Sequence, residues 1–237
     1  MAMVHYDVAG MSRAGHLSRN EDAYAVIETA DACLLAVADG VGGEADGDRA
    51  AQIAIETVTS FFTSMYRTGM DGSAVRGLLE YAFSGADRQI RAAAVGQARM
   101  GTTLVAAIVR EDQVWIANCG DSRAFVAGKE ILFKTWEHSL VSTLVRMGFL
   151  DPTAARDHPL KHVITHALGL TLCVDLYDAT IPADTALILC SDGLRDDVVR
   201  EILAKEEILE SETFARALVE GGAATSDDDV TVVVLKA

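Results

Sequence analysis

Acidic residues stand at the ends of several apolar segments of this chain of 237 residues. Asp39 follows the apolar run 33–38, and Asp192 comes shortly after the apolar run 186–190. A strand carries its terminal acid to one edge of a sheet, so several strands can bring their acids to the same place. One Asp-Gly pair after a strand is usually only a turn, but the repetition predicts a shared site. The other acids in such positions are Glu21, Asp22, Asp121, Asp227, Asp228 and Asp229.

Converging carboxylates repel one another, and this repulsion predicts a metal site. Two like charges about 4 Å apart repel by roughly 4 kcal/mol at an effective dielectric constant near 20. Several such pairs would cost more than the net stability of a typical domain, unless cations lie between them. Carboxylates, carbonyls and water are the ligands of hard divalent ions, so we expect Mn²⁺ or Mg²⁺ and not Zn²⁺. Gly40, Gly42 and Gly43 allow the backbone to approach an ion closely.

The composition restricts the partners. Asp and Glu number 35 against 20 Lys and Arg, which gives a net charge of −15. A surface this negative argues against nucleic acid or an anionic membrane as the main partner. The longest apolar runs, such as 32–38 and 104–109, have the length of strands, and the N-terminal residues do not resemble a secretory signal. We therefore expect a cytoplasmic protein without membrane insertion.

The cysteines support a reducing compartment. Their spacing is not that of a metal site, and each lies in an apolar stretch of sequence. We expect reduced thiols in the core, and neither disulfides nor metal ligands. The cysteines are Cys33, Cys119, Cys173 and Cys190.

The hydrophobic pattern predicts one domain over residues 1–237. Short connections between strands require antiparallel pairing, and the helices have apolar stripes suited to cover a sheet, so the pattern predicts a layered α+β sandwich. The more polar segment 137–170 is expected to be a flap-like insertion. The expected strands are 4–9, 23–29, 33–38, 102–110, 114–118, 124–126, 131–134, 187–190 and 230–235. The expected long helices are 50–65, 75–93, 197–205 and 212–220.

The acidic motifs occur in an order that resembles a known family. Each motif alone is weakly specific, but six in register cover nearly the whole chain. Together they closely resemble the bacterial type of the metal-dependent serine/threonine protein phosphatases, the PPM or type 2C family. The six motifs are Asn-Glu-Asp-Ala at 20–23, Ala-Asp-Gly-Val-Gly-Gly at 38–43, Gly-Thr-Thr at 101–103, Gly-Asp-Ser-Arg-Ala at 120–124, Ser-Asp-Gly-Leu at 191–194 and Asp-Asp-Val-Thr at 228–231.

The resemblance implies a four-layer α-β-β-α sandwich, with two antiparallel sheets between helices and a binuclear metal centre at one end. In the family, the second-motif aspartate bridges both ions, which implies this role for Asp39. The resemblance also implies that a water between the two ions attacks phosphorus, with Asp22 and Asp39 as catalytic residues. It assigns the carbonyl of Gly40 to one ion, Asp192 and Asp228 to the other, Glu21 and Asp22 to the surrounding shell, and Asp121 and Asp196 to a third, weaker ion.

Three positions depart from the family. Many relatives have an arginine that grips the substrate phosphate where Leu17 stands, so Arg19 is either its substitute or an ordinary surface residue. Val41 occupies the place where some eukaryotic relatives carry a histidine proposed as general acid. Asp229 replaces the usual asparagine of the last motif and adds charge beside Asp228.

The leading hypothesis is hydrolysis of phosphoserine and phosphothreonine on proteins, which reverses the action of a Ser/Thr kinase. The alternative is a catalytically weak metal-binding protein that captures phosphoproteins, which the replacement at Leu17 favours. A two-metal phosphodiesterase or nuclease is the third hypothesis, and the net charge argues against it.

Overall fold

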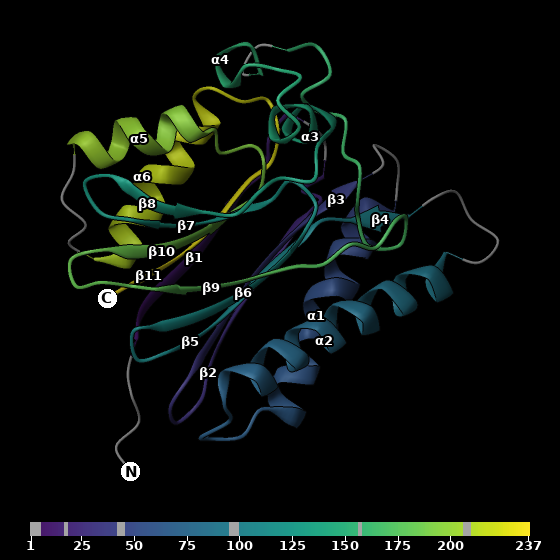
Figure 1. Cartoon of the computed structure of the whole chain (residues 1–237), viewed down its shortest axis with the longest axis vertical. Coiled ribbons are helices and arrows are strands. Elements are labelled where there is room, and N and C mark those ends of the chain that lie inside the picture. The colour runs from purple at the N-terminus through teal and green to yellow at the C-terminus, as the bar shows by residue number, and fades with distance from the viewer. Residues whose placement is uncertain (1–5, 17–18, 42–45, 95–99, 156–157, 206–209) are drawn as a thin grey trace.

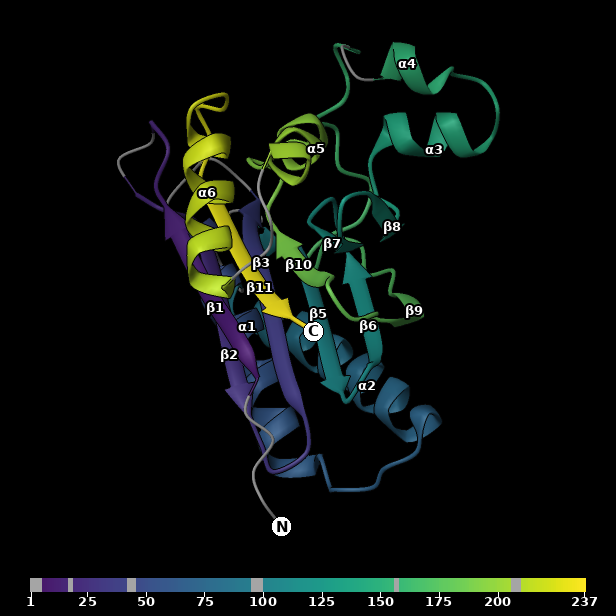
Figure 2. The ribbon, with the colours of Figure 1, turned by 90° about the vertical axis from the view of Figure 1, so that its left-hand side faces the viewer.

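A computed structural model of the whole chain describes residues 6–16, 19–41, 46–94, 100–155, 158–205 and 210–237. Within these residues, two antiparallel sheets stack face to face between two layers of helices (Figures 1 and 2). The predicted four-layer α+β sandwich is confirmed.

Sheet I has the strand order β1-β11-β10-β7-β8, and helices α5 and α6 cover its outer face (Figure 1). Every pairing in it is antiparallel, for example Cys190 opposite Val232. Its elements are β1 (Asp7–Arg13), β7 (Arg123–Ala127), β8 (Ile131–Lys134), β10 (Ala186–Cys190), β11 (Val230–Lys236), α5 (Asp196–Lys205) and α6 (Ser211–Ala223).

Sheet II has the order β2-β3-β5-β6-β9, with the short strand β4 paired to the end of β3. Helices α1 and α2 lie on its outer face (Figure 2). Its elements are β2 (Asp22–Glu28), β3 (Cys33–Val41), β4 (Gly101–Thr102), β5 (Leu104–Arg110), β6 (Gln113–Cys119), β9 (Asp175–Thr180), α1 (Gly47–Met65) and α2 (Gly72–Ala93).

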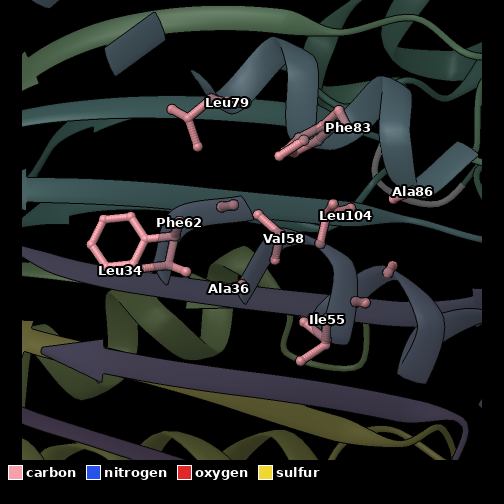
Figure 3. Close-up of a cluster of buried hydrophobic side chains, with 14 of the residues drawn as sticks. Leu34, Ala36, Ile55, Val58, Phe62, Leu79, Phe83, Ala86 and Leu104 are labelled. Atoms are coloured by element: carbon pink, nitrogen blue, oxygen red, sulfur yellow. The ribbon is translucent and has the colours of Figure 1, made fainter. Parts of the chain in front are cut away.

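The apolar sequence of strand β3 follows from its position between two buried layers. Successive side chains of a strand point to opposite faces. Leu34 and Ala36 face the helix layer, where Figure 3 shows them among side chains of α1 and α2. Leu35 and Val37 face the apolar layer between the sheets. Both faces of the strand are buried, so both must be apolar.

The two long helices bury their predicted stripes against sheet II. Phe62 of α1 and Phe83 of α2 are almost fully buried in the cluster of Figure 3. Helix α2 begins after Asp71, whose carboxylate accepts the backbone N–H of Ala74 at 2.9 Å as an N-cap. None of the helices in the described ranges has the length and apolarity needed to cross a bilayer.

Several predicted boundaries differ from the structure. The apolar pattern does not predict β9, because this strand lies at the edge of sheet II and its side chains are only half-buried or exposed. The predicted strand 102–110 is interrupted at Thr103, whose backbone N–H donates to the carbonyl of Asp39 at 2.8 Å. The predicted strand 4–9 is displaced to Asp7–Arg13, and residues 4 and 5 lie outside the described ranges.

The flap, defined here as residues 137–170, contains helices α3 (Leu140–Arg146) and α4 (Pro152–Ala155). It projects beyond one end of the sandwich, near α5 (Figures 1 and 2). Its two ends are joined by an antiparallel bridge between Ser139 and Ile164.

Truncation of Phe83 tests the packing of α2 on sheet II. Phe83→Ala removes a fully buried ring, so we expect it to lower the free energy of unfolding by about 3–5 kcal/mol in urea denaturation. Phe149→Ala is the matched control, because Phe149 is 77 % exposed on the flap. A comparable loss in both variants would contradict the assigned core.

Candidate metal centre

Two predicted acids lie opposite each other on neighbouring strands. Asp22 at the start of β2 pairs directly with Asp39 near the end of β3. Directly paired residues of antiparallel strands have their side chains on the same face. On β3 this face also carries Leu35 and Val37, which line the layer between the sheets. The two acids therefore lie where that apolar layer ends.

Sheet I brings further acids to the same place. Asp192 follows β10 and Asp228 precedes β11, and these strands are neighbours. The carboxyl groups of Asp192 and Asp39 are within hydrogen-bonding reach of each other. The pKa of Asp39 is raised well above 3.8, first by burial and then by the charges of nearby acids. These acids are Asp22, Asp192, Asp121 and Asp228.

Burial without compensating cations raises the pKa of the neighbouring acids as well. The pKa of Asp22 rises from 3.8 to about 7, chiefly through burial, although the hydroxyls of Thr231 and Ser191 partly offset the effect. Burial also raises the pKa of Asp121 to about 8, with the charge of Asp192 as the second cause. The protein thus holds a cluster of acids whose charged forms are unfavourable until a cation joins them.

The donors fit a hard divalent ion. Within the described part of the chain, Asp22 Oδ1 and Asp121 Oδ1 are buried and have no hydrogen-bond partner. An unpaired buried carboxylate oxygen is costly, and a cation would remove this cost. The polar atoms that converge are oxygens, which Mn²⁺ and Mg²⁺ accept as ligands. Residues of this type therefore fit the predicted ions.

The backbone at Gly40 and Gly47 is packed too closely for larger residues. A Cβ atom on Gly40 would lie 2.5 Å from the carbonyl oxygen of Gly47. A Cβ atom on Gly47 would lie 2.6 Å from Glu21 Oε2, so the Glu21 carboxylate touches the first residue of α1. The backbone N–H of Gly40 donates to the carbonyl of Glu21 at 3.1 Å. This packing fixes Glu21 beside the carbonyl of Gly40.

The Gly-Thr-Thr and Gly-Asp-Ser motifs support the site. The hydroxyl of Thr103 accepts the backbone N–H of Asp39 at 3.1 Å and lies 2.6 Å from the hydroxyl of Ser122. The sequence motif includes these residues but does not reveal that they orient the Asp39 backbone.

Asp229 explains a departure from the family. Its Oδ1 accepts the backbone N–H of Gly15 at 2.8 Å, and its Oδ2 accepts that of Glu21 at 2.6 Å. A carboxylate can accept from both donors, whereas an asparagine has only one acceptor oxygen. Asp229 thereby holds the segment around Glu21, although its charge contributes to raising the pKa of Glu21 after the larger effect of burial.

Asp196 has a different environment from the other predicted ligands. Its Oδ1 accepts from Arg123 Nη1 at 2.9 Å and its Oδ2 from Lys134 Nζ at 2.6 Å. Burial alone would raise its pKa, but the charges of Arg123 and Lys134 outweigh burial and lower it. Arg123 and Lys134 thus already neutralise both carboxylate oxygens. A metal ion at Asp196 would have to displace these two side chains.

Arg123 was not among the predicted site residues, although it stands in a motif. It is buried, and its Nη2 donates to the carbonyls of Ser191 at 3.1 Å and Leu194 at 2.5 Å. It also donates to the carbonyl of Asp192 at 3.3 Å. Arg123 therefore orients the loop that carries Asp192.

Arg19 lies beside the acids but is paired. Its Nε is 3.0 Å from Asp48 Oδ2, and its side chain is 68 % exposed. Arg19, Asp22, Asp48 and Arg49 help to line a cavity of about 620 Å³. Leu17, Gly42 and Gly43 lie outside the described residues.

All four cysteines are free thiols, as predicted, but the predicted core position is wrong for Cys173. Cys33, Cys119 and Cys190 are buried, but Cys173 is only half-buried. Its sulfur lies close to the side chains of His138 and Asp175, so its surroundings are polar. The sequence around Cys173 is apolar because its neighbours Leu172 and Val174 pack against the core between sheet II and its helices.

The raised pKa values predict a pH dependence for the metal-free protein. Asp22 and Asp121 bind protons more tightly in the folded state, so their contribution to stability is complete below pH 3.8 and is lost as the pH rises through about 7 and about 8. In EDTA, urea denaturation should give a free energy of unfolding lower at pH 8 than at pH 5 by about 2 kcal/mol or more. Mn²⁺ should restore the stability at pH 8.

Asp22→Asn is the control for this experiment, because it removes one of the titrating groups. Its metal-free stability should depend less on pH than that of the wild type. A wild-type protein whose stability at pH 8 is unaffected by EDTA would contradict the acid cluster.

Sequence relatives of this chain are named as serine/threonine phosphatases. A serine/threonine phosphatase, Stp, of Listeria innocua is 32% identical over 228 residues, which cover 92% of this chain and 90% of that protein. The serine/threonine protein phosphatase PstP of Mycobacterium tuberculosis is 33% identical over 219 residues, which cover 86% of this chain and 40% of PstP.

Solved structures agree with these sequence relatives. The crystal structure of the serine/threonine phosphatase Stp1 from Staphylococcus aureus has a TM-score of 0.90 at 28% identity, with 100% of this chain and 96% of that chain covered. The catalytic domain of PstP in complex with two manganese ions has a TM-score of 0.77 at 29% identity, with 97% and 96% covered. The family model for protein phosphatase 2C matches residues 9–225. The chain belongs to the protein phosphatase 2C family.

Proposed function

We propose that this protein hydrolyses phosphoserine and phosphothreonine in proteins at a centre of two divalent ions, with Asp121 available to a third. The observation that carries the proposal is the convergence of buried acids from both sheets, two of which have unpartnered oxygens. The named relatives are serine/threonine phosphatases, and one neighbouring structure contains two manganese ions. Phosphoproteins are therefore the proposed substrates, and a Ser/Thr kinase is the proposed opposing enzyme.

The acids have separate proposed roles. Asp39 is close enough to four other acids for their charges to raise its pKa, which suits it to bridge two ions. Asp192 and Asp228 come from sheet I and would hold one ion, while the Gly40 carbonyl would hold the other. Glu21 and Asp22 would complete the surroundings of that second ion.

Two divalent ions held by these oxygens would make a water more acidic and would neutralise the phosphoryl oxygens. The protein's own contribution is to orient that water and to receive its proton. Asp22 is suited to both, because its Oδ2 accepts from the Ser191 hydroxyl at 2.8 Å while its Oδ1 has no partner among the described residues. Ser191 thus fixes the carboxylate and leaves one oxygen for the attacking water.

A cysteine-based phosphatase mechanism does not fit this chain. Such a mechanism needs an accessible thiolate with a low pKa. Cys190 lies near Asp192, but it is buried, and burial raises the pKa of its thiol to about 11 despite the opposing charge of Arg123. The free thiols are instead consistent with the proposed location in the cytoplasm.

Replacement of Asp39 tests the proposed function. With Mn²⁺ and a phosphothreonine peptide, Asp39→Asn should lower kcat by about 100-fold or more, because the central ligand is lost. Asp112→Asn, at an exposed turn of sheet II, is the matched control and should retain activity. A wild-type protein without activity, or equal activity in the wild type and Asp39→Asn, would refute the proposal.

The Arg19–Asp48 ion pair favours low activity, which the second candidate function, a weakly active protein that captures phosphoproteins, requires. Arg19 must leave Asp48 before it can grip a phosphate. Asp48→Asn should therefore lower the KM of the wild-type reaction several-fold, and Arg19→Ala should raise it, since a guanidinium contact to phosphate is strong. Steady-state kinetics measures both. Tight phosphopeptide binding without turnover in all variants would favour the second function instead.

A further inference from the structure

A group of side chains at the base of the flap has no role in the proposed mechanism. His138 at the start of the flap is buried, and its Nε2 lies 3.2 Å from Asp175 Oδ2 at the start of β9. The thiol of Cys173 lies within 4.8 Å of ligand atoms of both residues. This group connects sheet II with the flap.

The hydrogen bonds of His138 fix which ring nitrogen carries the proton. The backbone N–H of Gly120 donates to His138 Nδ1 at 3.2 Å, so Nδ1 must be unprotonated. A neutral imidazole then carries its proton on Nε2, which faces Asp175. In the other direction, the backbone N–H of His138 donates to the carbonyl of Gly120 at 2.9 Å. His138 therefore holds both polar groups of the Gly120 backbone.

Gly120 is the residue before Asp121, and its conformation is unusual. Its φ of 116° lies in the region that favours glycine. A Cβ atom there would lie 2.5 Å from Cβ of Thr103, the residue that supports the Asp39 backbone. Because Asp121 is the next residue, a small movement of the Gly120 backbone would displace the Asp121 carboxylate.

The same histidine joins the two ends of the flap. The backbone N–H of Thr165 donates to the carbonyl of His138 at 2.7 Å, and the Thr165 hydroxyl donates at 2.9 Å. The ring of His166 packs edge-on against that of His138, with 5.2 Å between ring centres. The Tyr177 hydroxyl donates to Asp175 Oδ2 at 3.1 Å and keeps this carboxylate in place.

Histidine, cysteine and aspartate also form a donor set suited to Zn²⁺. A metal-bound histidine, however, almost always donates its second ring N–H to an acceptor. Here the second nitrogen, Nδ1, faces the backbone N–H of Gly120. A metal ion on Nε2 would place the ring proton on Nδ1, so two N–H donors would face each other. The hydrogen bonds thus favour a positioning role over a second metal site.

We propose that His138, whose Nδ1 accepts from Gly120 and whose Nε2 faces Asp175, is a positioning residue that fixes Gly120 and with it the carboxylate of Asp121. This proposal rests on the proposed function, because it treats Asp121 as a metal ligand. It makes the ends of the flap and the ligand Asp121 parts of one hydrogen-bonded unit.

Two substitutions separate the two ring contacts. In His138→Asn the amide oxygen takes the place of Nδ1 and can still accept from Gly120. In His138→Gln the amide nitrogen reaches the place of Nε2 and can still donate to Asp175, but the acceptor for Gly120 is lost. His158→Gln is the matched control, because His158 Nδ1 accepts the backbone N–H of Leu160 at 3.1 Å elsewhere on the flap.

Mn²⁺ affinity is measured by calorimetry, and exchange of the Gly120 amide is measured by NMR without metal. We expect His138→Gln to weaken Mn²⁺ binding at the Asp121 site by about tenfold and to accelerate exchange of the Gly120 amide. His138→Asn should stay within about threefold of the wild type, and His158→Gln should match it. If His138→Gln does not fold, Asp175→Asn replaces it, with a smaller loss expected in the same direction.

Equal effects of the Asn and Gln substitutions, or unchanged Mn²⁺ affinity and amide exchange in the Gln variant, would overturn the proposal. So would stoichiometric Zn²⁺ binding by the wild type that Cys173→Ser abolishes. The amide exchange needs no catalysis, so failure of this proposal is distinct from failure of the proposed function, in which the wild type itself is inactive.

Discussion

Repulsion between buried carboxylates is the constraint on which the rest of the structure depends. Asp22 and Asp39 face each other across two paired strands, and Asp192 comes within hydrogen-bonding reach from the other sheet. Within the described residues, Asp22 Oδ1 and Asp121 Oδ1 are buried without a hydrogen-bond partner. The surrounding elements therefore hold the acids against their own repulsion. The tightly packed glycines, the Thr103 hydroxyl and the buried Arg123 each fix one segment of backbone beside an acid.

The sequence predicts the layers well because their signals are local. The apolar residues of strand β3 and helices α1 and α2 show which faces of these elements are buried. The acids of the centre are predicted because their strands end at the same edge. Strand β9 is not predicted, since its half-buried residues give a weak pattern and its place beside β6 depends on distant residues.

The remaining parts of the site depend on contacts between distant residues. The pairing of Asp196 with Arg123 and Lys134 joins positions that are far apart in the chain, and nothing in their spacing indicates it. The polar surroundings of Cys173 and the tautomer of His138 likewise depend on residues that only folding brings together. Asp229 is different, because its departure from the family motif is visible in the sequence. The two backbone N–H groups that it accepts from are not.

The placement of the acids on both sheets has a mechanical consequence. Asp39 lies on one sheet and Asp192 just beyond a strand of the other, and the two sheets face each other across an apolar layer. Apolar contacts are not directional, so they resist separation of the sheets better than they resist sliding. A slip of the sheets would spread the acids apart while both β-ladders stayed intact. Loss of catalytic activity would then be the most sensitive sign that the two sheets have slipped. Heating would abolish the activity before any change in strand content could be detected.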